Sequence, residues 1–172
     1  LIPNQIWSLE QIQGLYYVAV PIRMTVIKID DGLMLINPLP PTKELANELE
    51  KLIMMHGKVK TIVLPNSSGL EHKIGLPPLA RVFKDAEIWL CPNQWSFPIN
   101  LPLDFLGIPS KRTKILFQDG TPYEEFFKWS SLGPLNLGLG IFQEVSCFHL
   151  LTRTLHVTDA IVGIDAKPPE IF

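Results

Sequence analysis

The clearest periodic pattern along the chain predicts a helix between residues 42 and 57. Thr42 is a plausible N-cap and Gly57 marks the end of the pattern. Between them, apolar side chains recur at helical spacing, at Leu45, Leu49, Leu52 and Ile53. This segment therefore predicts a helix with one apolar face.

Two short and nearly all-apolar runs, residues 60–64 (KTIVL) and 87–91 (EIWLC), are typical of strands buried on both faces. A second helix is expected between them, opened by Pro77 and Pro78 and carrying Leu79, Val82 and Phe83 on one face. The order strand, helix, strand, helix, strand predicts an α/β arrangement.

The first forty residues favour strands. Short β-prone runs at 5–7 and 16–20 are separated by the polar stretch QIQG. MTVIKI (24–29) and LMLIN (33–37), joined by Asp31 and Gly32, predict a hairpin. We therefore expect a β-meander ahead of the α/β part.

The last third of the chain has weaker patterns. Residues 92–111 carry four prolines amid Trp95, Phe97 and Phe105, which predicts a long irregular loop that acts as a lid or a binding surface. After it we expect a strand at TKILF (113–117) and a short helix at 124–129. FQEVSCFHL and RTLHVTD then alternate as a hairpin should.

Composition indicates one globular domain covering residues 1–172, with 47% hydrophobic and 19% charged residues. The net charge of −2, with no basic run, gives no reason to expect nucleic acid or an anionic membrane as a partner. No apolar run approaches the roughly 18 residues of a membrane span, and no signal-peptide pattern is present, so we expect an intracellular, soluble protein of the cytoplasm or an organellar stroma. Cys91 and Cys147 lie in apolar segments and are expected to be buried thiols.

Two strand ends carry side chains that could ligate a metal. Glu71 and His72 follow the strand KTIVL, and Asp159 ends RTLHVTD. In open α/β sheets ligands gather beyond the carboxyl ends of strands, and one imidazole with two carboxylates suits zinc, manganese or iron. The alternative is that Glu71 and His72 are solvated or cap a helix, and that Asp159 binds local backbone N–H groups.

The layout resembles the metallo-β-lactamase superfamily. The hairpin ending in GLMLINP, the helix, and the strand TIVLP leading into a loop follow the order of that family, whose active members carry HxHxDH in this loop. Laid on that motif, its ligands fall at Ser67, Gly69, Glu71 and His72. The strand end TLHVTD is similar to the family's TLFTGD, which sets Asp159 at the bridging aspartate, and the family's third-strand histidine falls near Gly140.

The resemblance implies a metallo-β-lactamase-like αββα sandwich in which mixed sheets are flanked by helices. It implies no known substrate, because the matching segments are similar to a branch whose function is uncharacterised. The dinuclear site of the family needs about five histidines and two acids, so a degraded site is implied. That site would hold one divalent metal on Glu71, His72 and Asp159. Its pocket would be completed by Glu144, which is close in sequence to the lost histidine position, or by residues beyond this segment.

Two functions follow from this resemblance and stay open. The first is a mononuclear or inactive hydrolase relative, in which Glu71 and Asp159 would be the catalytic acids. The second is a non-catalytic module that binds a small molecule or a protein through the aromatic loop around Trp95. Because the chain begins at Leu1 rather than Met and ends directly after a strand, we also expect it to be a segment of a longer protein, truncated at its C-terminus.

The remaining nucleophiles and imidazoles are expected to be structural. His149 lies at the predicted hairpin turn, and His156 should face away from Asp159 by strand alternation. His56 suits the carboxyl end of the first helix. Ser67 and Ser68 lack the GxSxG context of a nucleophile.

Overall fold

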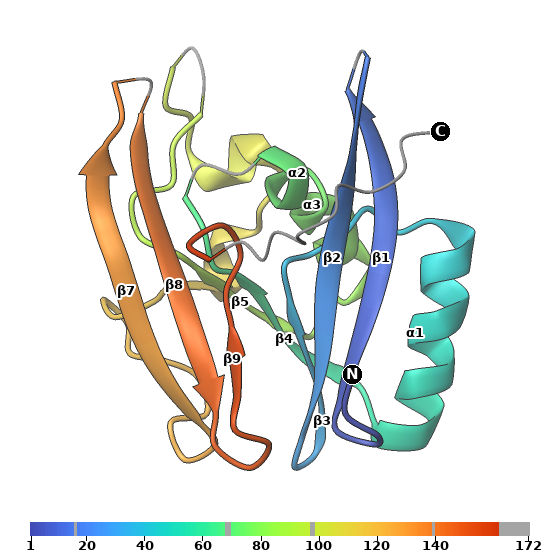
Figure 1. The fold of residues 1–172 in the computed structure, drawn as a ribbon. Helices are drawn as coiled ribbons and strands as arrows, with labels where there is room; N and C mark the ends of the chain where they lie inside the picture. Colours follow the sequence, from blue (N-terminus) through green and yellow to red (C-terminus); the bar gives the residue numbers. More distant parts are fainter. Residues whose placement is uncertain (16, 68–69, 97–98, 139, 162–172) are drawn as a thin grey trace, which may run out of the picture.

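The computed structural model describes residues 1–161 apart from 16, 68–69, 97–98 and 139. Its strands form two sheets that face each other, with the smaller sheet on the left in Figure 1 and α1 on the far right. The strands are β1 (Ile6–Leu15), β2 (Val18–Ile29), β3 (Gly32–Ile36), β4 (Val59–Leu64), β5 (Glu87–Leu90), β6 (Thr113–Ile115), β7 (Phe127–Asn136), β8 (Ile141–His149) and β9 (Thr154–His156). The helices are α1 (Lys43–His56), α2 (Leu70–Lys73) and α3 (Leu76–Val82), with 3₁₀ turns at Leu103–Leu106 and Ser110–Arg112.

The larger sheet has six strands in the order β1-β2-β3-β4-β5-β6. Its first three strands are antiparallel neighbours, which confirms the expected meander and hairpin. From β3 to β6 all neighbours are parallel. The crossover from β3 to β4 contains α1, and the crossover from β4 to β5 contains α2 and α3, as the alternation of strands and helices predicts.

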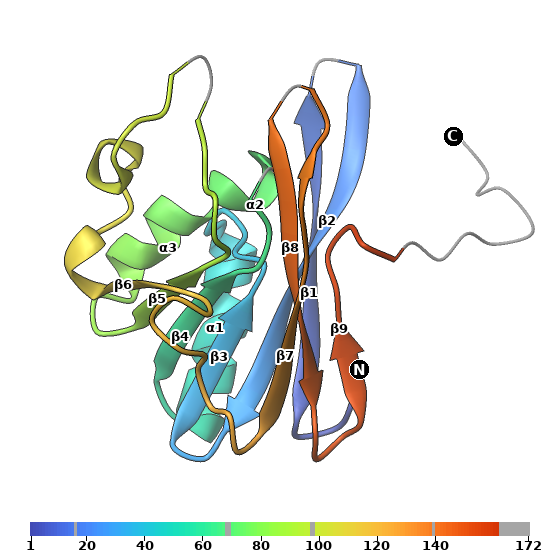
Figure 2. The same cartoon turned by 90° about the vertical axis from the view of Figure 1, so that its left-hand side faces the viewer.

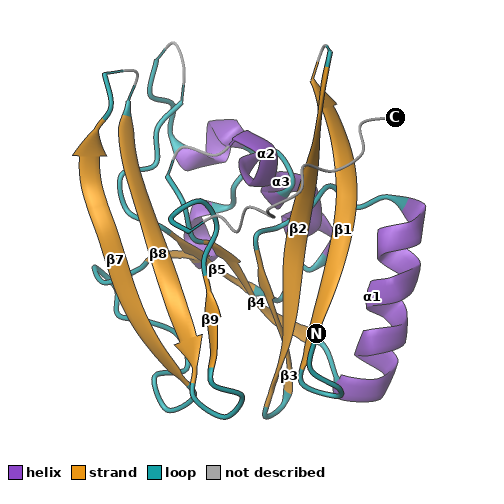
Figure 3. Ribbon diagram, viewed as in Figure 1, coloured by secondary structure: helices purple, strands orange, loops and turns teal. Residues whose placement is uncertain are grey.

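The smaller sheet is antiparallel, in the order β7-β8-β9. Within the described residues, strands and loops alone build this layer, and the helices lie against the larger sheet (Figure 3). The described part therefore has a helix, sheet, sheet order, and the second helical layer of an αββα sandwich is not found in it. None of the helices in this part has the length and apolar character needed to cross a membrane.

The central strands are buried on both faces because each side of the larger sheet has its own core. On β3, Leu33 and Leu35 point toward the helices, whereas Met34 and Ile36 point toward the smaller sheet. The helix side also contains Leu45, Leu49, Leu52, Leu76 and Leu79, and the side between the sheets also contains Val63, Trp89, Phe127, Val145 and Cys147. This double burial explains the continuous apolar runs in the sequence.

The predicted first helix is confirmed as α1. The Thr42 side chain accepts a hydrogen bond from the Leu45 N–H at 3.2 Å, so it is the N-cap. At the other end Gly57 adopts a φ of 94°, which a glycine accepts without strain. His56, in the last turn, packs against Trp7 with ring centroids 4.8 Å apart.

Three expectations from the sequence are wrong. The helix expected at 124–129 does not form, since β7 begins at Phe127 and runs to Asn136. The polar stretch QIQG lies in the second half of β1, and it does not break the chain into two strands. Glu71 and His72 lie on α2, a helix of one turn, instead of in a loop.

Gly75 sets how closely α2 and α3 approach the segment after β3. A Cβ added at Gly75 would lie 2.5 Å from the Pro38 carbonyl oxygen and 2.7 Å from the Leu39 carbonyl carbon. We expect Gly75→Ala to lower the free energy of unfolding by about 1–3 kcal/mol, because the two segments must separate. Urea denaturation measures this change.

Gly14→Ala is the matched control for this prediction. Its added Cβ meets nothing within 4 Å, so the free energy of unfolding should stay within about 0.5 kcal/mol of the parent protein. Equal effects of the two substitutions would contradict the close contact at Gly75.

Candidate functional site

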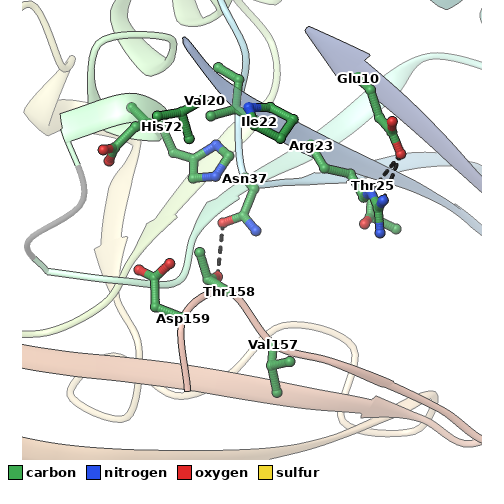
Figure 4. Close-up of a pocket in the computed structure, with 12 residues that line it drawn as sticks. Glu10, Val20, Ile22, Arg23, Thr25, Asn37, His72, Val157, Thr158 and Asp159 are labelled. Atoms are coloured by element: carbon green, nitrogen blue, oxygen red, sulfur yellow. Dashed lines mark hydrogen bonds and ion pairs between the residues drawn. The ribbon is translucent and has the colours of Figure 1, made fainter. Parts of the chain in front are cut away.

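A cavity of about 390 Å³ opens between β2, α2 and the segment after β9. In Figures 1 and 2, α2 lies toward the same end of the molecule as the end of β1 and the start of β8. The lining combines polar side chains with a short apolar wall, and Figure 4 shows most of these side chains. They are Glu10, Val20, Pro21, Ile22, Arg23, Thr25, Asn37, Glu71, His72, Val157, Thr158 and Asp159.

His72 is the most buried titratable group of this lining, with 7% of the residue exposed. Among the described residues its Nδ1 atom has no hydrogen-bond partner. Burial lowers the pKa of the imidazole below its ordinary value, although the nearby Pro38 backbone, Asp159 and Glu71 oppose this shift. The lowered pKa favours the neutral form of the ring near pH 7.

Asp159 is held at the cavity because the backbone of its segment is hydrogen-bonded to Glu144. Glu144, only 1% exposed, accepts hydrogen bonds from the N–H groups of Thr158 and Asp159 at 2.7 Å and of Ala160 at 2.9 Å. The Asp159 carboxylate accepts one further bond, from Asn66 Nδ2 at 3.1 Å. Both Glu144 oxygens are thus engaged in fixing this segment.

Asn37 connects the end of β3 to the same segment. Its Oδ1 accepts a hydrogen bond from the Thr158 hydroxyl at 3.1 Å, drawn as a dashed line in Figure 4. Its backbone has a φ of 60°, a left-handed conformation that asparagine tolerates better than most residues. The ring of His72, the amide of Asn37 and the carboxylate of Asp159 consequently border one space (Figure 4).

Ser67 joins the segment after β4 to β8. Its hydroxyl donates to the Ile141 carbonyl at 2.8 Å and accepts from the Gln143 N–H at 2.9 Å. Its own N–H donates to the Gln143 carbonyl, also at 2.9 Å. Because the residue is fully buried, these bonds are shielded from water.

Trp95 lies over the start of β8. A Cβ added at Gly140 would come within 2.7 Å of the indole, so only glycine leaves room for this ring. The indole Nε1 donates to the Ile141 carbonyl at 3.2 Å, and Lys73 Nζ donates to the Trp95 carbonyl at 3.0 Å. The aromatic loop is therefore fastened to β8 at this residue, and Phe97 lies outside the described residues.

The three residues predicted to ligate a metal, Glu71, His72 and Asp159, all line this cavity. They come from α2 and from the segment after β9, so the rule about strand ends located the cavity. Yet within the described part of the chain no group of three or more His, Cys, Asp or Glu side chains is placed to hold a metal ion. Their role as ligands stays a prediction.

The sequence reasoning missed Asn37, Asn66 and Thr158, which hydrogen-bond around the site, and all lining residues of β1 and β2. Asn37 directly follows β3 and Asn66 lies two residues after β4, so the rule that singled out Glu71 could have found them. The other histidines lie elsewhere: His149 stacks on Phe127 and its Nδ1 is 2.8 Å from the Thr152 hydroxyl. Cys91 and Cys147 are buried free thiols, as expected, and burial raises the pKa of each to about 12.

The donor set does not fit a dinuclear zinc centre. Such a centre needs several imidazoles and acids whose lone pairs are available. Here the Ser67 hydroxyl is bound to β8, Gly140 has no side chain, and the Glu144 carboxylate is taken by backbone N–H groups. We therefore derive no reaction step through a pair of metal ions.

Comparison with solved structures identifies the fold. The chain matches the metallo-β-lactamase DIM-1, in a structure exposed to ceftazidime, with a TM-score of 0.60 and 9% identity over 90% of this chain and 66% of that one. It matches a metallo-β-lactamase from Pontibacter korlensis with a TM-score of 0.57 and 15% identity, covering 90% and 67%. For FIM-1 from Pseudomonas aeruginosa in a mono-zinc form the values are 0.53 and 11%, covering 86% and 62%.

At these identities the likeness shows the fold alone, and it confirms the expected metallo-β-lactamase-like α/β architecture. The chain spans about two thirds of the length of these proteins. No curated protein matches its sequence. A family model does match, over residues 3–172, and the chain therefore belongs to the family described as "Domain of unknown function (DUF4336)".

Proposed function

We propose that this domain binds a small polar ligand in the cavity at His72, and that the cavity is the remnant of a metal site whose hydrolytic chemistry has been lost. The observation that carries the proposal is the cavity of about 390 Å³, whose lining brings His72, Asn37 and Asp159 to one space. A pocket of this volume, with a few polar groups on a partly apolar lining, is typical of sites for organic ligands.

The surroundings of His72 support binding rather than the hydrolysis of the similar folds. The resemblance assigns two metal-ligand positions of those folds to Ser67 and Gly140. Ser67 now bonds the two sheets together, and Gly140 contacts the indole of Trp95. These contacts stabilise the protein without a metal. We expect such contacts in a domain that still binds a ligand but no longer catalyses hydrolysis.

A mononuclear metal site is the second candidate, and it is favoured by the common location of Glu71, His72 and Asp159 on one cavity. These residues would hold one zinc, manganese or iron ion. A metal bound there would supply Lewis-acid chemistry.

The aromatic loop is a weaker candidate for a binding surface. Trp95 is packed against β8, so the exposed apolar side chains of this loop are others: Ile99 (64%), Leu101 (40%) and Phe105 (80%). A partner that recognised the loop would contact these residues rather than Trp95.

A ligand-observed NMR screen of small amines, acids, sugars and alcohols tests the proposal on the full chain. We expect some compounds to bind the parent protein and to lose at least about tenfold in affinity in His72→Ala, because a buried hydrogen bond contributes about 1.5 kcal/mol. Glu125→Gln, an exposed position outside the cavity lining, should leave affinity unchanged.

Two outcomes would overturn the binding proposal. One is that no compound of any class binds in a manner that depends on His72. The other is stoichiometric metal in the purified protein that is lost in both Glu71→Ala and His72→Ala, which would support the mononuclear site instead.

A further inference from the structure

The charges that line the cavity indicate which ligands it can accept, and this inference rests on the function proposed above. Three lining residues carry carboxylates: Glu10, Glu71 and Asp159. Arg23 is the guanidinium of the lining, and it is paired with Glu10, with Arg23 Nη2 2.7 Å and Nε 2.8 Å from Glu10 Oε1 (Figure 4). Among the described lining residues, Glu71 and Asp159 consequently have no cationic partner.

Within the described residues, the side-chain donor to these two carboxylates is neutral. Asp159 receives one neutral donor, Asn66 Nδ2 at 3.1 Å. An anion entering this space would be repelled, whereas a cation would be attracted.

Lys73 is the nearest lysine along the chain, and it is directed elsewhere. Its Nζ donates to the Ser67 carbonyl at 2.7 Å and to the Trp95 carbonyl at 3.0 Å. It is absent from the cavity lining. The ammonium group of Lys73, the residue after His72 on α2, therefore does not neutralise the carboxylates of Glu71 and Asp159.

Part of the cavity lining is apolar. It consists of Val20, Pro21 and Ile22 of β2 and of Val157; Val20 and Ile22 lie beside His72 in Figure 4. A bare metal ion would leave this apolar part without a contact. The volume of about 390 Å³ lies within the roughly 300–1,000 Å³ typical of pockets for organic ligands.

We propose that the ligand of this cavity is a small organic amine, whose ammonium group lies between Glu71 and Asp159 and whose hydrocarbon part contacts Val20 to Ile22. An ammonium has three N–H donors, which suit two carboxylates and one further acceptor. Asn37, whose amide oxygen is an acceptor, borders the same space together with His72.

The test compares three probes of the same shape: isopentylamine, isopentyl alcohol and isovalerate. Binding of each is measured by ligand-observed NMR to the full chain treated with a chelator, near neutral pH and at low ionic strength. We expect the amine to bind at least about tenfold more tightly than the alcohol and the carboxylate not to bind, because bonds to charged partners contribute about twice as much as neutral ones.

Charge-neutralising variants locate the site. The double variant Glu71→Gln/Asp159→Asn keeps the shape of both side chains and should bind the amine about tenfold more weakly, with little change for the alcohol. Circular dichroism and thermal unfolding would check that this variant folds. Glu125→Gln is the control for a carboxylate lost outside the cavity lining.

The outcomes separate this inference from the function on which it rests. Tighter binding of the alcohol or of isovalerate, lost in His72→Ala, would overturn the amine while keeping a ligand-binding cavity. If the double variant binds the amine as tightly as the parent protein does, the ammonium group does not lie between Glu71 and Asp159. If Zn²⁺ alone binds in a manner that depends on Glu71 and Asp159, the amine inference fails and the mononuclear site gains support.

Discussion

Replacing Glu144 with glutamine is expected to lower the free energy of unfolding by about 2–4 kcal/mol, since each bond to a buried charged group contributes about 1.5–3 kcal/mol. The carboxylate accepts three backbone N–H groups, from Thr158, Asp159 and Ala160. A glutamine offers one oxygen, and its NH₂ group must face at least one of these donors. Denaturation by urea measures the loss.

The same substitution should loosen the segment that carries Asp159. Amide hydrogen exchange at residues 158–160 is expected to accelerate, because these N–H groups lose their acceptor. Glu125→Gln removes a carboxylate that is exposed, and it should change stability by less than about 0.5 kcal/mol. If Glu144→Gln proved as stable as this control, the anchoring role of Glu144 would be wrong.

Mild acid is expected to destabilise the protein through His156. This side chain is partly buried at the end of β9, where Nε2 has no partner among the described residues. Burial lowers its pKa from 6.5 to about 4, and His149 adds to the shift. Above about pH 6.5 the imidazole is neutral in both the folded and the unfolded state, so its contribution to stability is then fully present.

As the pH falls below about 6.5, the unfolded chain binds a proton that the folded protein does not bind until about pH 4. The free energy of unfolding should therefore decrease by about 1.4 kcal/mol per pH unit, or about 3 kcal/mol over the whole window. His72 and His149, whose pKa values are also lowered by burial, act in the same direction.

His156→Phe isolates the contribution of this residue. The ring shape is kept and the titration is removed, so the decrease in stability between about pH 7.5 and about pH 5 should be smaller by about 2 kcal/mol than in the parent protein. Urea denaturation at a series of pH values provides the comparison. Parallel curves for the two proteins would show that His156 carries no such penalty.

Two kinds of element could be predicted from sequence: strands that are buried on both faces, and a helix whose periodicity and cap lie within its own segment. The strands β4 and β5 are buried on both faces, so their apolar runs are visible without knowing the neighbours. In α1 the period of the leucines and the cap at Thr42 agree with each other. By contrast, most side chains of β7 are exposed, and its Gly133 and Pro134 resemble a chain break.

The site was predictable in location but not in its contacts. Glu71, His72 and Asp159 could be named because each follows or ends a predicted strand, and all three line the cavity. The partners of Glu144 are backbone N–H groups about fifteen residues away, which no side-chain pattern reveals. The contact of Trp95 with Gly140 likewise depends on tertiary packing between segments far apart in sequence.

The bonds around Ser67 also bear on how the protein opens. Pro65 and Ser67 exchange backbone hydrogen bonds with β8, through Val145 N to Pro65 O at 2.7 Å and Ser67 N to Gln143 O at 2.9 Å. The chain leaving β4 in the larger sheet thus becomes a neighbour of the smaller sheet. Separating the sheets at this end would break main-chain bonds as well as apolar contacts, so the two layers should unfold as one cooperative unit.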